Sequence, residues 1–551
     1  MVSRVNTRIH LTTGFAGGAR DAGGGAAAQP AAMSRLRRCW GWLCDWRPAL
    51  GVVADLRARA PHYADDWLGG LRHWRRLLAP ITYIFLASLL PAIAFGEQLR
   101  QNTDAQYGVA QVLVADAIGG VAQSVVGGQP LLIVGVAQPM VLIYTFAFEY
   151  LDGRGRSDLF RPVMSIVLFF ASGLHALVAL ANWCQLVRHF TRFAGETFGF
   201  LIAVLFVTDA IRGLVHEFQA GTSGVQFDTG VPEGEESAWR LINGLWSLIL
   251  AGVLVALAVA LLGAEKWRVG RKPLRRALAA YGPLIAVVAV TGLSYAVGGA
   301  PGGADVPTRV DAQQVYESPA KDSWSTLGEL GNVSGEYIGF AFGVAILVTV
   351  LDFFDHNVSA ALAQQPEFGL RKGTAYSYDF LLQAVMFAVF GLCGLPPTNC
   401  VVPQAPLHTR ALAVTQRRKG KDKTKAARAV SRQRFGSRAL GSISRLFASS
   451  ADDLSDNVVV EADEENTPTA ESTSTGGASA AATTIEAGAN GAPSLATVRN
   501  VEIRVYEQRV SNLCQSLAIF ACCFLAPALR LIPRAAIWAY FFLMVCQWCH
   551  E

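Results

Sequence analysis

Two apolar segments of this chain are interrupted in the same way by glycine and proline: GGQPLLIVGVAQP at 127–139 and GLPPTNCVVPQ at 394–404. Glycine and proline break helices, and broken backbone at membrane depth occurs only where it lines a cavity or packs against protein. A helix that begins in mid-membrane leaves its first N–H groups unpaired and presents about half a positive charge. Two such ends that face each other would bind an anion without a cationic side chain. Alternatively, these prolines only kink ordinary spans, but their matched occurrence in both halves of the chain favours the first interpretation.

The composition indicates that both segments belong to a protein embedded in lipid. The chain has 551 residues, of which 52% are hydrophobic and 16% are charged, and its mean hydropathy is +0.33. A soluble domain carries about 25% charged residues, so this chain lacks the charge to cover a globular surface. Its apolar residues come in long uncharged blocks, and a bilayer needs about 20 of them per helix. We therefore predict an all-α polytopic membrane protein with spans near 77–96, 108–126, 129–149, 162–184, 196–217, 240–263, 279–297, 336–361, 377–393, 398–414, 510–529 and 532–548.

The loops between these spans alternate in charge. Basic residues concentrate at 266–276, at 371–372 and at 417–445, where eleven basic residues stand against one acid, Asp422. The loop at 219–238 has four acids and no basic residue. Because loops rich in lysine and arginine stay on the cytoplasmic side, we predict a cytoplasmic N-terminus.

The composition also divides the chain into four parts. We expect a disordered, basic cytoplasmic N-terminus at 1–62, spans 1–10 at 63–416, a disordered cytoplasmic insert at 417–507 and spans 11–12 at 508–551. The insert runs from basic residues through an acidic patch into a tract of threonine, serine, alanine and glycine. Such a composition buries too little apolar surface to offset the entropy of ordering the chain.

One expected span, 336–361, contains two carboxylates and a histidine. Asp352 and Asp355 are three residues apart and therefore share a helix face, and His356 follows them. Carboxylates inside the membrane are energetically costly and by default functional. We interpret Asp355 as an acid essential for transport or ion coupling and extend this hypothesis to Asp352. The alternative for Asp352 is a place near a wetter helix end or a cap on a neighbouring helix.

Other kinds of function find little support in the sequence. No catalytic constellation, nucleotide-binding loop or nucleophile elbow stands out, so we expect neither an enzyme nor a cofactor, a metal or a nucleic-acid partner. The expected partners are the lipid bilayer and a small anion. Asn332 begins a glycosylation sequon in a loop predicted to be external.

Four strings resemble the boron transporter branch of the bicarbonate transporter, or anion exchanger, family. They are GQPLLIVGVAQP at 128–139, FDHNVSAALAQQ at 354–365, PPTNCVVPQAPLHT at 396–409 and EQRVSN at 507–512. The resemblance runs from about Tyr63 to Met544 and is interrupted by the insert. It implies two inverted repeats of seven spans, a core domain and a gate domain that move against each other, a homodimer and a plasma-membrane location.

The resemblance also implies which residues contact the substrate. Asp355 corresponds to the intramembrane acid of the eighth span. The substrate would lie between the starts of the third and tenth spans, against Gln129, Pro130, Thr398, Asn399, Val401, Val402, Pro403 and Gln404. Gln404 stands where the animal exchangers carry an arginine.

The chain departs from the family pattern at three places. Gln138 stands where boron transporters usually have glutamate, and Asp352 stands where an aromatic residue is common. The chain ends at Glu551, after the twelfth expected span, so about 12 of the usual 14 spans are present. We interpret this end as a truncated gene model with an incomplete gate domain.

Three hypotheses for function follow. The first is a secondary active transporter of a small inorganic anion, with borate export as its activity. The second is a bicarbonate or chloride exchanger. The third, of another class, is a membrane scaffold or regulator that does not transport, which the missing last spans would explain.

Overall fold

The computed structural model describes residues 48–189, 192–219, 236–297, 306–316, 324–417 and 501–550. The expected disordered segments at 1–47 and 418–500 therefore lie outside the described residues. Within the described ranges, seven helices are long and apolar enough to cross a membrane. They are α4 (Trp74–Asn102), α7 (Phe160–Leu180), α8 (Arg192–Glu217), α9 (Glu236–Leu262), α10 (Lys272–Leu293), α11 (Gly335–Ala363) and α12 (Tyr376–Cys393).

Shorter helices complete the apolar part of the chain. They are α5 (Val109–Val125), α6 (Gln138–Asp152), α13 (Gln404–Ala411), α15 (Val510–Cys522), α16 (Ala526–Leu529) and α17 (Arg534–His550). The spans expected at 129–149 and 398–414 are broken, because extended backbone precedes α6 and α13. The prediction of interrupted helices is thus confirmed, and the helical part of each begins later than the expected start.

Two segments expected to be disordered are in fact structured. Helices α2 (Leu50–Arg59) and α3 (Tyr63–Arg72), joined by η1 (Ala60–His62), precede the first span, and strand β4 (Val501–Val505) pairs with β3 (Ala413–Arg417). The expectation was wrong at 50–62 because Arg59 is buried, where its guanidinium contacts the carboxylates of Asp66 and Glu507. It was wrong at 501–507 because the antiparallel ladder and the buried Glu507 fix this end of the insert.

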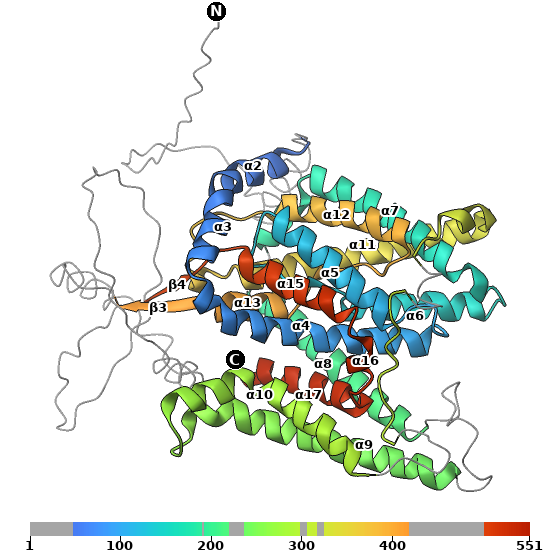
Figure 1. Ribbon diagram of the computed structural model, residues 1–551. Coiled ribbons are helices and arrows are strands. Elements are labelled where there is room, and N and C mark those ends of the chain that lie inside the picture. The colour runs from blue at the N-terminus through green and yellow to red at the C-terminus, as the bar shows by residue number, and fades with distance from the viewer. Residues whose placement is uncertain are drawn as a thin grey trace, which may run out of the picture. The chain divides into compact units, whose positions relative to one another are not determined.

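The helices of the unit at 48–551 form two groups (Figure 1). In the core group, α7 packs against α11 and α12, and α5 packs against α4 and α15. In the gate group, α9 packs against α10 and α17, and α17 packs against α8. Helix α4 joins the two groups through its contacts with α10 and α17.

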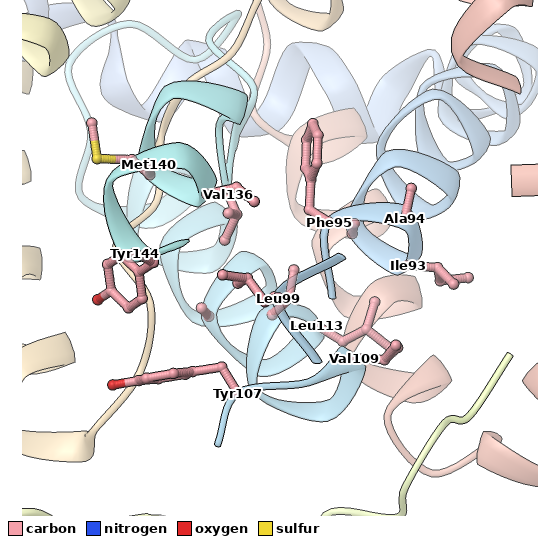
Figure 2. Close-up of a cluster of buried hydrophobic side chains, with 14 of the residues drawn as sticks. Ile93, Ala94, Phe95, Leu99, Tyr107, Val109, Leu113, Val136, Met140 and Tyr144 are labelled. Atoms are coloured by element: carbon pink, nitrogen blue, oxygen red, sulfur yellow. The ribbon is translucent and has the colours of Figure 1, made fainter. Parts of the chain in front are cut away.

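The centre of the core group is a cluster of buried side chains around the start of α6 (Figure 2). Helices α4 and α5 approach so closely that a Cβ atom on Gly96 would lie 2.5 Å from the Cα of Val109. Small residues allow such approaches in membrane proteins, where close packing of helices replaces the hydrophobic driving force. The cluster includes Ile93, Phe95, Leu99, Tyr107, Leu113, Val136, Met140 and Tyr144.

Candidate functional site

The two interrupted segments cross each other inside the core group. Strand β1 (Val134–Gly135) pairs antiparallel with β2 (Asn399–Cys400), with Val134 opposite Cys400 and Gly135 opposite Asn399. The Val401 N–H extends this contact by donating to the Ile133 carbonyl at 3.1 Å. All of these residues are buried. Because each strand leads directly into a helix, the pairing places the starts of α6 and α13 beside each other.

A carboxylate from a neighbouring helix holds the first of these starts in place. Asp116 of α5 is buried, and its Oδ1 accepts a hydrogen bond of 2.7 Å from the Val136 N–H. This contact satisfies a backbone donor that the break in the helix leaves without an intrahelical acceptor. Asp116 was not singled out from the sequence, although it is an acid within an apolar segment, as Asp355 is.

A small cavity lies at the two helix starts. Its lining comes from α4, the starts of α6 and α13, α8 of the gate group, and α11. The residues are Phe95, Val136, Ala137, Gln138, Pro139, Ile202, Phe206, Asp355, Val401, Val402 and Gln404. The cavity measures about 20 Å³ for the centres of water-sized spheres, which is room for about one water molecule. Asp355 is the charged residue of this lining, so a bound anion would rely on backbone dipoles and amides for its attraction.

Asp355 is held by the extended segment opposite it. It is 2% exposed, and its Oδ2 accepts a hydrogen bond of 3.1 Å from Asn399 Nδ2. Asn399 Oδ1 in turn accepts from the Cys400 N–H at 2.6 Å and contacts His356 Nδ1 at 3.2 Å. Asn399 therefore connects the acid of α11 to the backbone of β2. Because its Oδ1 only accepts, His356 Nδ1 is the nitrogen that donates in this contact.

Two glutamines supply unpaired polar groups at the cavity. Gln138 and Gln404 are the first helical residues of α6 and α13 and are 2% and 4% exposed. Both side-chain polar atoms of Gln138 and the Oε1 of Gln404 lack partners among the described residues. A buried polar atom without a partner costs about 1–3 kcal/mol. A small ligand with hydroxyl groups would satisfy these atoms.

The comparison with known proteins agrees with this geometry. The HCO3- transporter integral membrane domain matches residues 47–231 and 226–443. The chain belongs to this family. Boron transporter 4 of Arabidopsis thaliana is 37% identical over 519 residues, covering 89% of this chain and 71% of that protein. Anion exchange protein 2 of Equus caballus is 28% identical over 403 residues, covering 67% of this chain and 32% of that protein.

Among solved structures, the transmembrane domain of a cyanobacterium bicarbonate transporter, BicA, is similar over 86% of this chain and 89% of that chain. The TM-score is 0.48 at 12% identity. The expected all-α, multi-pass membrane fold of the anion-exchanger type is confirmed for this member of the HCO3- transporter family. In the described chain, the broken segment is the third in each half: it follows α4 and α5 in the first half and α11 and α12 in the second.

In this HCO3- transporter family member, the predicted substrate residues near the tenth span lie at or close to the cavity, whereas those near the third span do not line it. Val401, Val402 and Gln404 line the cavity, and Asn399 lies directly behind Asp355. Pro403 lines an adjoining hollow with Phe206 of the gate group. The Thr398 hydroxyl is buried without a partner in the described chain, and its carbonyl accepts a hydrogen bond from Gln383.

Gln129 and Pro130 do not line the cavity of this family member. The N–H groups of Gly128 and Gln129 donate to the Asp379 carboxylate at 2.6 and 3.0 Å, and Gln129 Nε2 donates to Gln364. A turn at 130–131 and the short strand β1 separate these residues from the helix start at Gln138. The expected helix start was at the first proline, whereas the helix begins only after the strand pair.

Other lining residues were missed because they come from distant elements. Phe95 belongs to α4, and Ile202 and Phe206 belong to α8. Apolar residues within apolar spans carry no mark that distinguishes a cavity lining from a lipid contact. The sequon residue Asn332 is exposed in η7 (Leu327–Asn332), and its glycosylation stays a prediction.

Proposed function

We propose that this protein is a secondary active transporter that carries borate across the membrane. The observation that supports this most directly is the cavity formed by the starts of α6 and α13 together with Asp355. Helix starts bind anions through their N–H groups and dipoles, and the half-helices of transporters do so at mid-membrane. We propose borate as the substrate, and not another anion, because the boron transporter relative is more similar to this chain than the anion exchange protein.

The chemistry of the lining fits a small hydroxylated anion. A tetrahedral borate presents hydroxyl groups that both donate and accept hydrogen bonds. The amide of Gln138 offers a donor and an acceptor, the Oε1 of Gln404 offers an acceptor, and Asp355 offers an acceptor for a substrate hydroxyl. The cavity has room for about one water molecule, so we propose that it widens when the substrate enters.

The two sides of the cavity suggest how access alternates. Its core side comes from α4, α6, α11 and α13, and its gate side comes from Ile202 and Phe206 of α8. Movement of the core group along the gate group would carry the helix starts past these two apolar side chains. We propose this elevator-like movement as the transport step.

Borate flux into proteoliposomes that contain the purified full-length chain tests the proposal. We expect flux by the wild type and its loss in Asp355→Ala, because that change removes the acid and leaves the Asn399 amide unpaired. The matched control is Glu329→Ala, an exposed acid in η7 outside the cavity, which should retain wild-type flux. Normal flux in correctly folded Asp355→Ala would reject the role of this acid.

A bicarbonate or chloride exchanger is the second candidate, and the description of the matching family domain favours it. The same proteoliposomes, loaded with labelled bicarbonate or chloride, distinguish the two. Faster bicarbonate flux than borate flux would favour the exchanger. The absence of flux for all three anions in the wild type would favour the scaffold or regulator.

The remaining expectations are proposals of the same kind. They are the export direction, a homodimer, a plasma-membrane location and a cytoplasmic N-terminus. Export would appear as borate flux from the side that carries the N-terminus, measured in oriented vesicles. A monomer mass by light scattering in detergent would contradict the dimer.

A further inference from the structure

A second buried acid lies outside the cavity and pairs with a histidine. Asp352 of α11 and His175 of α7 are both 0% exposed, and His175 Nε2 lies 2.8 Å from Asp352 Oδ2. The His175 ring stacks on Phe380 at 4.7 Å between centroids and lies 4.6 Å from Phe387. Asp352 does not line the cavity. The transport role proposed above therefore leaves this pair unexplained.

The hydrogen bonds of His175 fix how many protons the pair holds. His175 Nδ1 lies 2.7 Å from the Ala171 carbonyl, which only accepts, so Nδ1 carries a hydrogen. The short contact between Nε2 and Oδ2 then needs one further proton, shared between the imidazole and the carboxylate. With that proton, the pair is neutral overall, whether it is an ion pair or a neutral acid beside a neutral imidazole.

The pair has an open position for one more proton. Asp352 Oδ1 is buried and has no hydrogen-bond partner among the described residues. In a buried pair of purely structural use, such an atom is costly. Replacing a buried ion pair with apolar residues is often neutral or stabilising, so stability alone does not explain the pair.

The titratable groups around the pair connect it electrostatically to the anion cavity. Asp355 and His356 on the same helix both interact with Asp352, and His356 also interacts with His175. Cys400 of β2 interacts with Asp352, Asp355 and Asp379 of α12. Cys184 of η3 (Trp183–His189) and Tyr376 of α12 lie in the surrounding apolar cluster. Among the described residues, the ion pair of Asp352 is with His175, so a proton added there gives this pair a positive charge.

We propose that the His175–Asp352 pair is a proton-binding site of the carrier that takes up one proton when an anion occupies the cavity. The proton comes from a hydronium ion or a protonated buffer molecule in the solvent, whose bond to that proton breaks as the proton binds Asp352 Oδ1, and the charge of the pair rises from zero to plus one. An anion next to Asp355 favours this uptake because charges interact strongly in a buried, low-dielectric region. By linkage, proton uptake strengthens anion binding by the same factor. This inference rests on the anion-binding role of the cavity.

Calorimetric titration of the purified full-length chain with borate tests the inference. Titrations in two buffers with different ionisation enthalpies give the number of protons exchanged per anion bound. We expect Asp352→Asn and His175→Gln to take up fewer protons than the wild type, by up to one. The proton release by boric acid itself is the same in each titration, so it cancels in the difference. A coupled proton changes affinity by up to about tenfold per pH unit, so both variants should show a shallower dependence of borate affinity on pH.

Asp352→Asn keeps the side-chain shape, and its amide donates to a neutral His175 Nε2, so this variant retains the contact. The matched control is Thr349→Val, one turn earlier on α11, whose buried hydroxyl donates to the Ala345 carbonyl of its own helix. Proton uptake equal to wild type in folded Asp352→Asn would overturn the inference, as would an equal reduction in Thr349→Val. If wild-type protein binds no borate, the proposed function fails, whereas normal wild-type binding with unchanged variants rejects only the proton site.

Discussion

At the scale of single residues, several of the polar groups buried around the site are held by a specific partner. Asn399 satisfies both Asp355 and the Cys400 N–H, and Asp116 satisfies the Val136 N–H. Inside a membrane, a polar group without such a partner has no water molecule with which to form a hydrogen bond. Both polar atoms of Gln138 lack partners among the described residues, and Gln138 lines the cavity, so these atoms are positions that a ligand could fill.

Two neighbouring acids on α3 show how burial decides the effect of a charge. Lys372 Nζ lies 2.5 Å from an oxygen of Asp65 and 2.8 Å from one of Asp66. The side chain of Asp65 is 67% exposed, whereas that of Asp66 is 0% exposed and also contacts Arg59 and Arg509. We therefore expect very different consequences when each acid is neutralised.

Asp66→Asn should lower the free energy of unfolding by about 3–5 kcal/mol, because it leaves two buried guanidinium groups without this partner. Asp65→Asn, the matched control, should cost less than about 1 kcal/mol because water screens an exposed pair. Thermal unfolding in detergent measures both. A loss in Asp65→Asn as large as in Asp66→Asn would contradict this account.

The pH dependence of the exposed acid has a definite sign. The hydrogen bond from Lys372 holds the pKa of Asp65 below its ordinary value of 3.8. A lowered pKa in the folded state gives a stabilisation that is present above the ordinary pKa and is lost as the pH falls through the folded value. Asp65 therefore adds no pH dependence near neutrality.

At the scale of elements, helix contacts depend on positions where only glycine fits. Gly96 brings α4 against the backbone of α5, and backbone atoms cannot move aside as a side-chain end can. Gly119 of α5 faces a side chain instead: an added Cβ atom would lie 2.4 Å from the Thr398 hydroxyl oxygen. These contacts position the strand pair that separates the two half-helices from their preceding segments.

Gly96→Ala should destabilise the protein by about 1–3 kcal/mol, because overpacking forces α4 away from α5. The matched control is Gly252→Ala in α9, where nothing lies within 4 Å of the added methyl group. Alanine favours a helix over glycine by about 1 kcal/mol, so the control should be neutral or slightly stabilising. The unfolding temperatures of the two variants test this prediction. Equal values would show that α4 and α5 can move apart without cost.

At the scale of the whole molecule, the two helix groups are joined by α4. Glu97 of α4 is buried and contacts both Arg100 on its own helix and Arg534 of α17. The cavity lies at the same junction, where Phe95 of α4 meets Phe206 of α8. A movement between the groups would therefore change the cavity and this ion pair together.

The ends of the long insert are held next to each other. Strands β3 and β4 pair over five residues, and α15 packs against α4 and α5. We expect trypsin to cut the insert between 418 and 500 only from the side that carries the N-terminus, since its basic half follows the positive-inside pattern.

After such a cut, the two fragments should stay together in size-exclusion chromatography, because the packing of α15 and α17 remains intact. Protection of the insert in vesicles that expose the N-terminus would contradict the topology. Separation of the fragments in mild detergent would contradict the role of the hairpin and of α15.

The amino-acid sequence was enough to predict the class of protein, the approximate positions of the long spans and the two interrupted segments. Length and hydrophobicity set the spans, and proline and glycine set the breaks, because these properties act locally along the chain. The intramembrane acid Asp355 was also identifiable, since a carboxylate in an apolar segment is costly wherever the chain goes.

Only the tertiary structure decided where the site lies along each interrupted segment. Because Val134 pairs with Cys400, the helix starts at Gln138 and not at Gln129, where the sequence had led us to expect it. The packing of helices α4 and α8 places Phe95 and Phe206 at the cavity. Strand pairing and helix packing join residues hundreds of positions apart, and a buried apolar side chain looks the same in sequence whether it faces lipid, a neighbouring helix or a substrate.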